Sequence, residues 1–164
     1  MRVWHSGRES LWSTPATTAS AGTVFGSFFL VWTLAFVIEQ GFLMAGKGAL
    51  TRGAVLGIIL AVVLLAAAVI FLAWNSQVEN NRVLAIGIGG GLGWFMLLNV
   101  WGIVWRANKR LIAWTRETSA ARPMPDKLAR LMRQAFLASR ANFFISFPML
   151  FFMGASSHYP LFGR

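Results

Sequence analysis

The stretch GAVLGIILAVVLLAAAVIFLAW, residues 53–74, decides the fold class of this protein. It contains no charged side chain and no amide side chain. A helix needs about 20 apolar residues to cross the roughly 30 Å hydrocarbon core of a bilayer, and this run is long enough. Because lipid offers the backbone no hydrogen-bond partner, such a run satisfies its peptide groups as a helix. The stretch therefore predicts a transmembrane helix.

Three more apolar segments predict further spans at about residues 23–45, 83–105 and 137–157. Of the 164 residues, 57% are hydrophobic and only 12% are charged, whereas a soluble domain carries about 25% charged residues. The polar N-terminal arm, residues 1–22, is followed by an apolar run too long for a secretory signal, so the first span is predicted to stay uncleaved. The predicted fold is all-α: an integral membrane bundle of four transmembrane helices in one domain, residues 23–164.

Lysine and arginine gather between the third and fourth spans. Residues 106–140 hold nine of them against two acidic side chains. The positive-inside rule places this segment, and the short loop with Lys47 and Arg52, in the cytoplasm. Both termini then face the periplasm, and the chain is predicted to be a multi-pass protein of the bacterial inner membrane. Since most surface beyond this loop would lie in lipid, the net charge of +10 does not indicate a nucleic-acid partner.

The basic loop, residues 106–136, contains a helical pattern of its own. Apolar residues recur at i, i+3, i+4, i+7 and i+8 from Leu128 to Phe136, with basic residues between them. This pattern predicts one amphipathic interfacial helix that lies along the inner membrane face and leads into the fourth span. Three of its basic side chains are predicted to dock on membrane lipids or on an acidic cytoplasmic partner: Lys127, Arg130 and Arg133.

Polar side chains inside the predicted spans collect near the cytoplasmic side. Glu39 is the one carboxylate within a span, and a carboxylate at that depth is costly unless it has a partner. The prediction is an interhelical clamp in which Glu39 pairs with Arg140 or Arg106. A proton relay, a contact to a quinone headgroup and a substrate site are the alternatives. The predicted intramembrane polar cluster comprises Glu39, Asn99, Arg106, Arg140 and Asn142.

The third span contains the glycine-rich run IGIGGGLGW. Gly87 and Gly91 stand at GxxxG spacing, as do Gly89 and Gly93. Glycines at this spacing let a neighbouring helix approach closely, which predicts helix packing and self-association or assembly with other membrane subunits. A flat cofactor, haem or quinone, lying over the glycine face is the alternative.

The sequence offers little catalytic chemistry. It has no cysteine and two histidines, His5 in the polar arm and His158 at the end of the fourth span. A haem held by His158 would need its second axial ligand from a partner chain. Nucleophilic triads, paired acids and His/Cys metal spacing are absent, so no metal site is predicted and no catalytic residue is assigned.

The segment at residues 139–160, SRANFFISFPMLFFMGASSHYP, resembles the last membrane helix of the urate hydroxylase family. Residues 99–101, Asn-Val-Trp, are similar to a second segment of that family. Its members are bacterial integral-membrane enzymes that pass electrons to a fused C-terminal cytochrome c. The residues that carry the resemblance in the last span are Asn142, Pro148, His158, Tyr159 and Pro160.

This sequence departs from that family in several ways. It ends four residues after Pro160, so no cytochrome c domain is expected, it has fewer predicted spans, and Ala141 stands where members carry a histidine. The resemblance implies a non-catalytic or electron-transfer-associated subunit of a membrane complex. The alternative is a membrane urate oxidoreductase module that dimerises and passes electrons to a separate cytochrome c. A lipid-binding or scaffolding protein is a third class.

Overall fold

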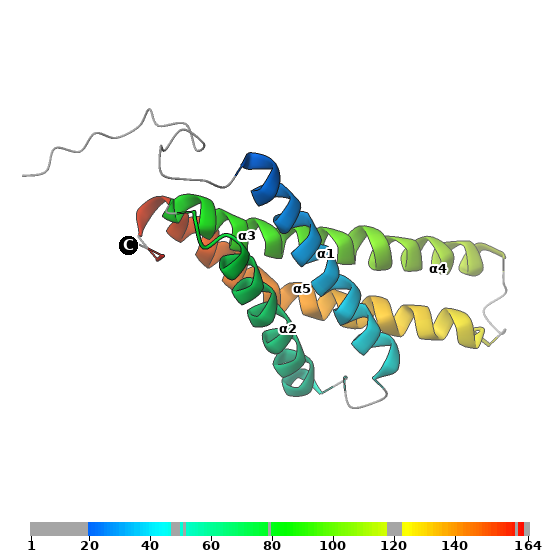
Figure 1. The fold of residues 1–164 in the computed structure, drawn as a ribbon. Coiled ribbons are helices and arrows are strands. Elements are labelled where there is room, and N and C mark those ends of the chain that lie inside the picture. Colours follow the sequence, from blue (N-terminus) through cyan, green and yellow to red (C-terminus); the bar gives the residue numbers. More distant parts are fainter. Residues whose placement is uncertain are drawn as a thin grey trace, which may run out of the picture.

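A computed structural model describes residues 20–46, 50, 52–78, 80–117, 123–159 and 161–162. The regular secondary structure in these residues is helical, and four helical segments are long and apolar enough to cross a membrane, which confirms the predicted all-α membrane bundle. Most of the predicted N-terminal arm lies outside the described residues. The helices are α1 (Ala21–Ala45), α2 (Gly53–Trp74), α3 (Asn81–Leu98), the π-helix η2 (Asn99–Val104), α4 (Trp105–Glu117) and α5 (Asp126–His158) (Figure 1).

The first two helices lie within two residues of their predicted bounds, but the other two helical segments are much longer than predicted. The segments α3, η2 and α4 form one helix of 37 residues, about 55 Å long at 1.5 Å per residue. The α5 helix has 33 residues and a length of about 50 Å. Each exceeds the roughly 30 Å hydrocarbon core by about 20 Å. The predicted loop is therefore largely helical.

These extensions lie side by side and form a helical hairpin (Figure 1). We call it the basic hairpin: α4 together with the first turns of α5, residues 126–136. The predicted amphipathic helix is present, but it is continuous with the fourth span rather than a helix of its own. No proline or glycine stands between residues 103 and 117, so nothing stops α4 where the apolar run ends.

The third helical segment is at the centre of the bundle, where α3 contacts α1, α2 and α5. Three of its glycines receive side chains from those neighbours: a Cβ on Gly91 would meet Trp32 of α1, one on Gly87 would meet Phe71 of α2, and one on Gly89 would meet Met153 of α5. The predicted packing role holds for these three glycines within one chain. It does not hold for Gly93, where a Cβ would meet nothing within 4 Å.

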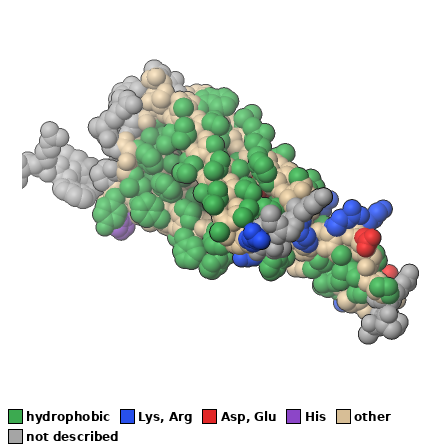
Figure 2. Space-filling view, turned by 90° about the horizontal axis from the view of Figure 1, so that it is seen from below, with side chains coloured by type: hydrophobic (Ala, Val, Ile, Leu, Met, Phe, Trp, Pro, Cys, Tyr) green, Lys and Arg blue, Asp and Glu red, His purple; other side chains and the backbone are tan. Residues whose placement is uncertain are grey.

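The outward faces of the spans are apolar. Leu30 on α1, Leu65 on α2 and Leu150 on α5 are each more than half exposed. Figure 2 shows hydrophobic side chains over most of one face of the molecule, with Lys and Arg gathered toward one end. Such a surface suits hydrocarbon and would associate in water. The bundle is therefore a multi-pass membrane fold with one polar, basic end.

Candidate functional site

Five polar side chains from three helices meet inside the bundle, at the level where the spans lead toward the basic hairpin. We call this group the amide cluster: Glu39 and Gln40 of α1, Asn99 at the start of η2, and Gln134 and Asn142 of α5. Glu39 and Asn99 have no exposed surface at all. Polar groups are expensive at such a position unless they satisfy one another, so their arrangement determines what the cluster can do.

Gln40 is the hub of the cluster. Its Nε2 donates one hydrogen bond to Glu39 Oε2 and another, of 2.8 Å, to Asn99 Oδ1. Its Oε1 accepts a hydrogen bond of 2.7 Å from Nε2 of Gln134. The three hydrogen bonds described for the Gln40 amide therefore join it to Glu39, to η2 and to α5.

The cluster continues from η2 into α5. Asn99 Nδ2 donates to Asn142 Oδ1 at 3.0 Å, and Asn142 Nδ2 donates to the backbone carbonyl of Met96 at 3.1 Å. A π-helix is rare, usually occurs as a single wide turn inside an α-helix, and is frequent at functional sites. Here the wide turn begins at Asn99 itself, which it holds in the buried interior, while Trp101 on the same turn is 65% exposed.

The structure brings together three residues of the predicted polar cluster. Glu39, Asn99 and Asn142 come together, and the hydrogen bond described for Glu39 comes from Gln40 to its Oε2 rather than from an arginine. Arg106 is exposed on α4. Arg140 lies elsewhere on α5, with its guanidinium 5.6 Å from the Phe136 ring and close to Gly53, the first residue of α2. Because an arginine side chain is long, its guanidinium can lie far from its own Cα, so its place in the sequence alone does not fix its partner.

Sequence reasoning missed the roles of Gln40 and Gln134. Gln40 is next to Glu39, and Gln134 lies about two helical turns before Asn142. The spacing of Gln134 and Asn142 places them on one helix face only if residues 126–158 form one helix, rather than a loop followed by a span.

One oxygen of the cluster is left over. Glu39 Oε1 is buried and has no hydrogen-bond partner. Most buried polar atoms in proteins are paired, so an orphan atom on a buried carboxylate requires a physical explanation.

Arg133, predicted to dock on lipid or a partner, faces the fold. Its Nη1 donates to the carbonyl of Leu43 at 3.4 Å, and its Nη2 donates to the carbonyl of Gly46. These carbonyls end α1, where an α-helix leaves its last carbonyls unpaired and carries partial negative charge. Arg133 therefore caps α1 and attaches it to α5. Lys127 and Arg130 are exposed, as docking requires.

Replacing Arg133 with alanine is expected to lower the free energy of unfolding by about 1–3 kcal/mol, because two carbonyls at the end of α1 lose a charged donor. Arg130→Ala removes the same charge from an exposed position of α5 and is the matched control, with an expected change within about 0.5 kcal/mol. The measurement is SDS-induced unfolding in mixed micelles, followed by far-UV circular dichroism. Equal losses for the two variants would contradict the capping role.

Two further motif residues, His158 and Tyr159, lie at the opposite end of the molecule from the basic hairpin. His158 ends α5 and is exposed, and the exposed Tyr159 follows it. Asn81 at the start of α3 fixes this end: its Nδ2 donates to the carbonyl of Tyr159 at 3.0 Å, and its Oδ1 accepts from the backbone N–H of Phe162 at 2.7 Å. Pro160 is outside the described residues. Pro148 lies within α5 and lines an apolar cavity with Trp32 and Phe152.

The described residues offer at most one histidine ligand for a haem, His158. Its imidazole stands exposed at a helix end, and it is the one histidine in the described part of the chain. His5 lies outside that part. The described residues also contain no group of three or more His, Cys, Asp or Glu that could hold a metal ion.

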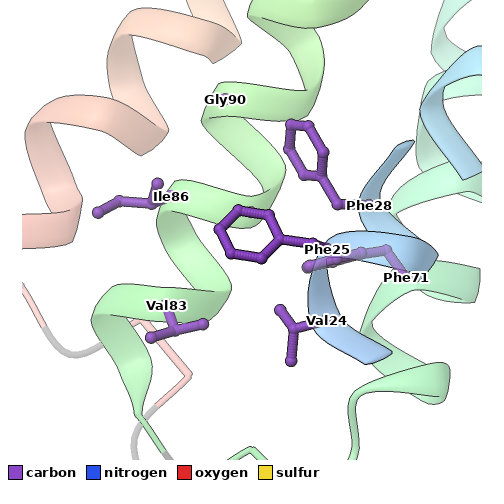
Figure 3. Close-up of a pocket in the computed structure, with 8 residues that line it drawn as sticks. Val24, Phe25, Phe28, Phe71, Val83, Ile86 and Gly90 are labelled. Carbon is purple, nitrogen blue, oxygen red and sulfur yellow. The ribbon is translucent and has the colours of Figure 1, made fainter. Parts of the chain in front are cut away.

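An apolar cavity of about 300 Å³ lies over the glycine face, between α1, α2 and α3 (Figure 3). Its lining offers no side-chain hydrogen-bond donor and no ligand atom for a haem iron or a quinone headgroup. The cavity suits a hydrocarbon chain, such as the acyl chain of a lipid. It is lined by Val24, Phe25, Phe28, Phe71, Val83, Ile86, Gly87 and Gly90.

Comparison with protein-family models, with curated proteins and with solved structures gives no match for this chain. What can be said of its function therefore rests on the amide cluster, the basic hairpin and the apolar surface.

Proposed function

We propose that this chain is a non-catalytic or electron-transfer-associated subunit of a membrane complex, related to the membrane domain of urate hydroxylase. The observation that carries the proposal is the hydrogen bond between Asn99 and Asn142. Residues 99–101 and 139–142, two separate segments on which the resemblance rests, meet at this bond. Because the two segments that resemble the family pack against each other, the resemblance supports a bundle architecture shared with that family.

The state of the amide cluster favours a non-catalytic role. The hydrogen bonds described for the cluster amides stay within the protein: Gln40, Asn99 and Asn142 bond to one another, to Glu39, to Gln134 and to a backbone carbonyl. The cavity over the glycine face has no polar lining and lies on another part of the bundle. A catalytic site needs reactive groups that face a substrate, and amides already bonded to each other hold helices together.

The surface available to the rest of a complex is the basic hairpin. Lys127 and Arg130 are exposed on α5, and Lys127 lines a hollow with Arg110 and Trp114 of α4. Ile112 of α4 is 50% exposed. Charge beside an exposed apolar side chain suits an acidic protein surface or anionic lipid headgroups. In the proposed topology the hairpin is in the cytoplasm of a bacterial cell, and both termini are in the periplasm.

In that topology the C-terminal end of α5 faces the periplasm and the C-terminal end of α4 faces the cytoplasm, so thiols at these two places are expected to label differently. Because the chain has no cysteine, a single introduced thiol is free of background. Tyr159→Cys, at an exposed position near the end of α5, is expected to react with a membrane-impermeant maleimide in intact spheroplasts. Glu117→Cys, exposed at the end of α4, is expected to react only after the membrane is opened. The reverse pattern would overturn the orientation.

The alternative function, a urate oxidoreductase module that dimerises and reduces a separate cytochrome c, is favoured by one observation. His158 is exposed at the end of the chain where, in the proposed topology, a periplasmic cytochrome c could approach. This function requires a redox group, which the described residues around His158 do not hold by themselves.

An absorption spectrum decides between the two functions. The protein is purified in mild detergent, and spectra are recorded in air and after dithionite reduction. The non-catalytic subunit is expected to show no band above about 300 nm beyond aromatic absorption. A Soret band that shifts on reduction, and that is lost in His158→Ala but kept in Tyr159→Phe, would exclude the subunit without a redox group and favour a redox role.

A further inference from the structure

We propose that Glu39 and the amide oxygens around it form an intramembrane binding site for a small monovalent cation such as Na⁺. Glu39 is fully buried within α1, and its Oε1 has no hydrogen-bond partner. A buried carboxylate with an unused oxygen lacks what a bound cation would supply, namely positive charge and a ligand for that oxygen.

The charged groups on the neighbouring helices do not supply this charge through a described bond to Glu39. On α5, Arg133 donates to the carbonyls at the end of α1, and Arg140 lies near Gly53. On the helix that continues from η2, Arg106 is exposed. The hydrogen bond that Glu39 does accept comes from the neutral amide of Gln40.

The donor set is one carboxylate and several neutral oxygens. Gln40 Nε2 bridges Glu39 Oε2 and Asn99 Oδ1, so these two oxygens converge on one point between α1 and η2. If the Gln40 amide turns about its terminal bond, its oxygen takes the place of that nitrogen and faces the oxygens of Glu39 and Asn99. The Gln134 amide then turns as well, so that its oxygen accepts from Gln40 Nε2. Carboxylate, amide and carbonyl oxygens are the ligands of hard cations.

The single negative charge selects a monovalent ion. Calcium sites tune their affinity by the number of charged ligands, and the described residues offer no cluster of acids. The basic hairpin lies on the same side as the cluster and repels a divalent cation twice as strongly as a monovalent one. In membrane transporters, Na⁺ binds where a helix departs from α geometry, and the departure here is η2.

Gln134 marks the route to the site. It is half-buried on α5 and donates to Gln40 Oε1, so a line of polar side chains leads from the base of the basic hairpin to Glu39. A cation entering along it exchanges water for amide oxygens in steps rather than crossing hydrocarbon.

The test is thermal unfolding of the full chain in detergent at constant ionic strength, roughly 0.15 M, with choline replaced stepwise by Na⁺. Na⁺ is expected to raise the Tm saturably by about 5 °C when in large excess over its Kd. Glu39→Gln keeps the shape and the bond to Gln40 and is expected to lose the response. Asn75→Ala, which removes a buried amide between α1 and α2 at the far end of the bundle, is expected to keep it.

Several outcomes would overturn the cation site. Equal Tm values in Na⁺ and choline would do so, as would a Tm that follows pH and ignores Na⁺, which would indicate a proton on Glu39. If Glu39→Gln does not fold, binding of radioactive ²²Na⁺ to the wild-type protein decides. Saturation near one ion per chain supports the site, and binding that choline salts abolish contradicts it.

Discussion

Gly91→Leu is expected to prevent the bundle from folding, and Gly91→Ala to lower the free energy of unfolding by about 2–3 kcal/mol. A Cβ at Gly91 would lie 1.9 Å from Nε1 and 2.0 Å from Cε2 of Trp32, well inside van der Waals contact. Trp32 is completely buried, and the added Cβ would meet its rigid indole ring rather than the end of a flexible side chain. The backbones of α1 and α3 would have to separate. SDS-induced unfolding followed by far-UV circular dichroism measures the loss.

Gly93→Ala is the matched control, in the same helix and two residues away. Its added methyl would meet nothing within 4 Å. Alanine is favoured over glycine in a helix interior by about 1 kcal/mol, so this variant is expected to be as stable as the wild type or slightly more stable. If both variants lose the same stability, the contact with Trp32 is not the reason that glycine stands at position 91.

The two glycines also show what spacing can and cannot predict. Gly87, Gly89, Gly91 and Gly93 share the same GxxxG spacing, and this spacing predicted close approach. It could not say that the approaching groups are the Phe71 and Trp32 rings, because those residues are distant in the sequence. Nor could it say that Gly93 faces open space, since that depends on the direction in which α3 rotates within the bundle.

The transmembrane helices were predictable because hydropathy depends only on local composition. The most apolar 18-residue window of α2 has a mean hydropathy of 3.3, and α2 begins and ends at the residues where the predicted span does. The basic hairpin was not predictable from the same signal. Hydropathy falls after Trp105 while the helix continues to Glu117, because most residues there are good helix formers and α4 packs against α5.

The buried cluster was half predictable. The cost of a carboxylate in lipid drew attention to Glu39, and the depths of Asn99 and Asn142 placed them beside it. The choice of an arginine as partner followed charge alone. The structure pairs Glu39 with the neighbouring Gln40, an interaction that needs no long side chain to be ordered and no second charge to be desolvated.

Asn99→Leu is expected to cost about 2–3 kcal/mol of unfolding free energy, the second of the two largest effects. Asn99 has no exposed surface, and its side chain accepts from Gln40 and donates to Asn142. Leucine has similar bulk but leaves both amides without this partner inside the bundle. Interhelical hydrogen bonds in membranes average only about 0.6 kcal/mol, so most of the cost comes from the two amides left unpaired.

A double-mutant cycle separates that cost from a change in packing. Asn142→Ala alone loses the bond to Asn99 and the bond to the Met96 carbonyl. In the Asn99→Leu background the first of these bonds is already gone, so Asn142→Ala is expected to cost less there, by about 0.5–2 kcal/mol. SDS-induced unfolding of the four proteins gives the coupling. Additive losses would mean that Asn99 and Asn142 act independently, and the bond that joins the two motif segments would no longer support a shared architecture.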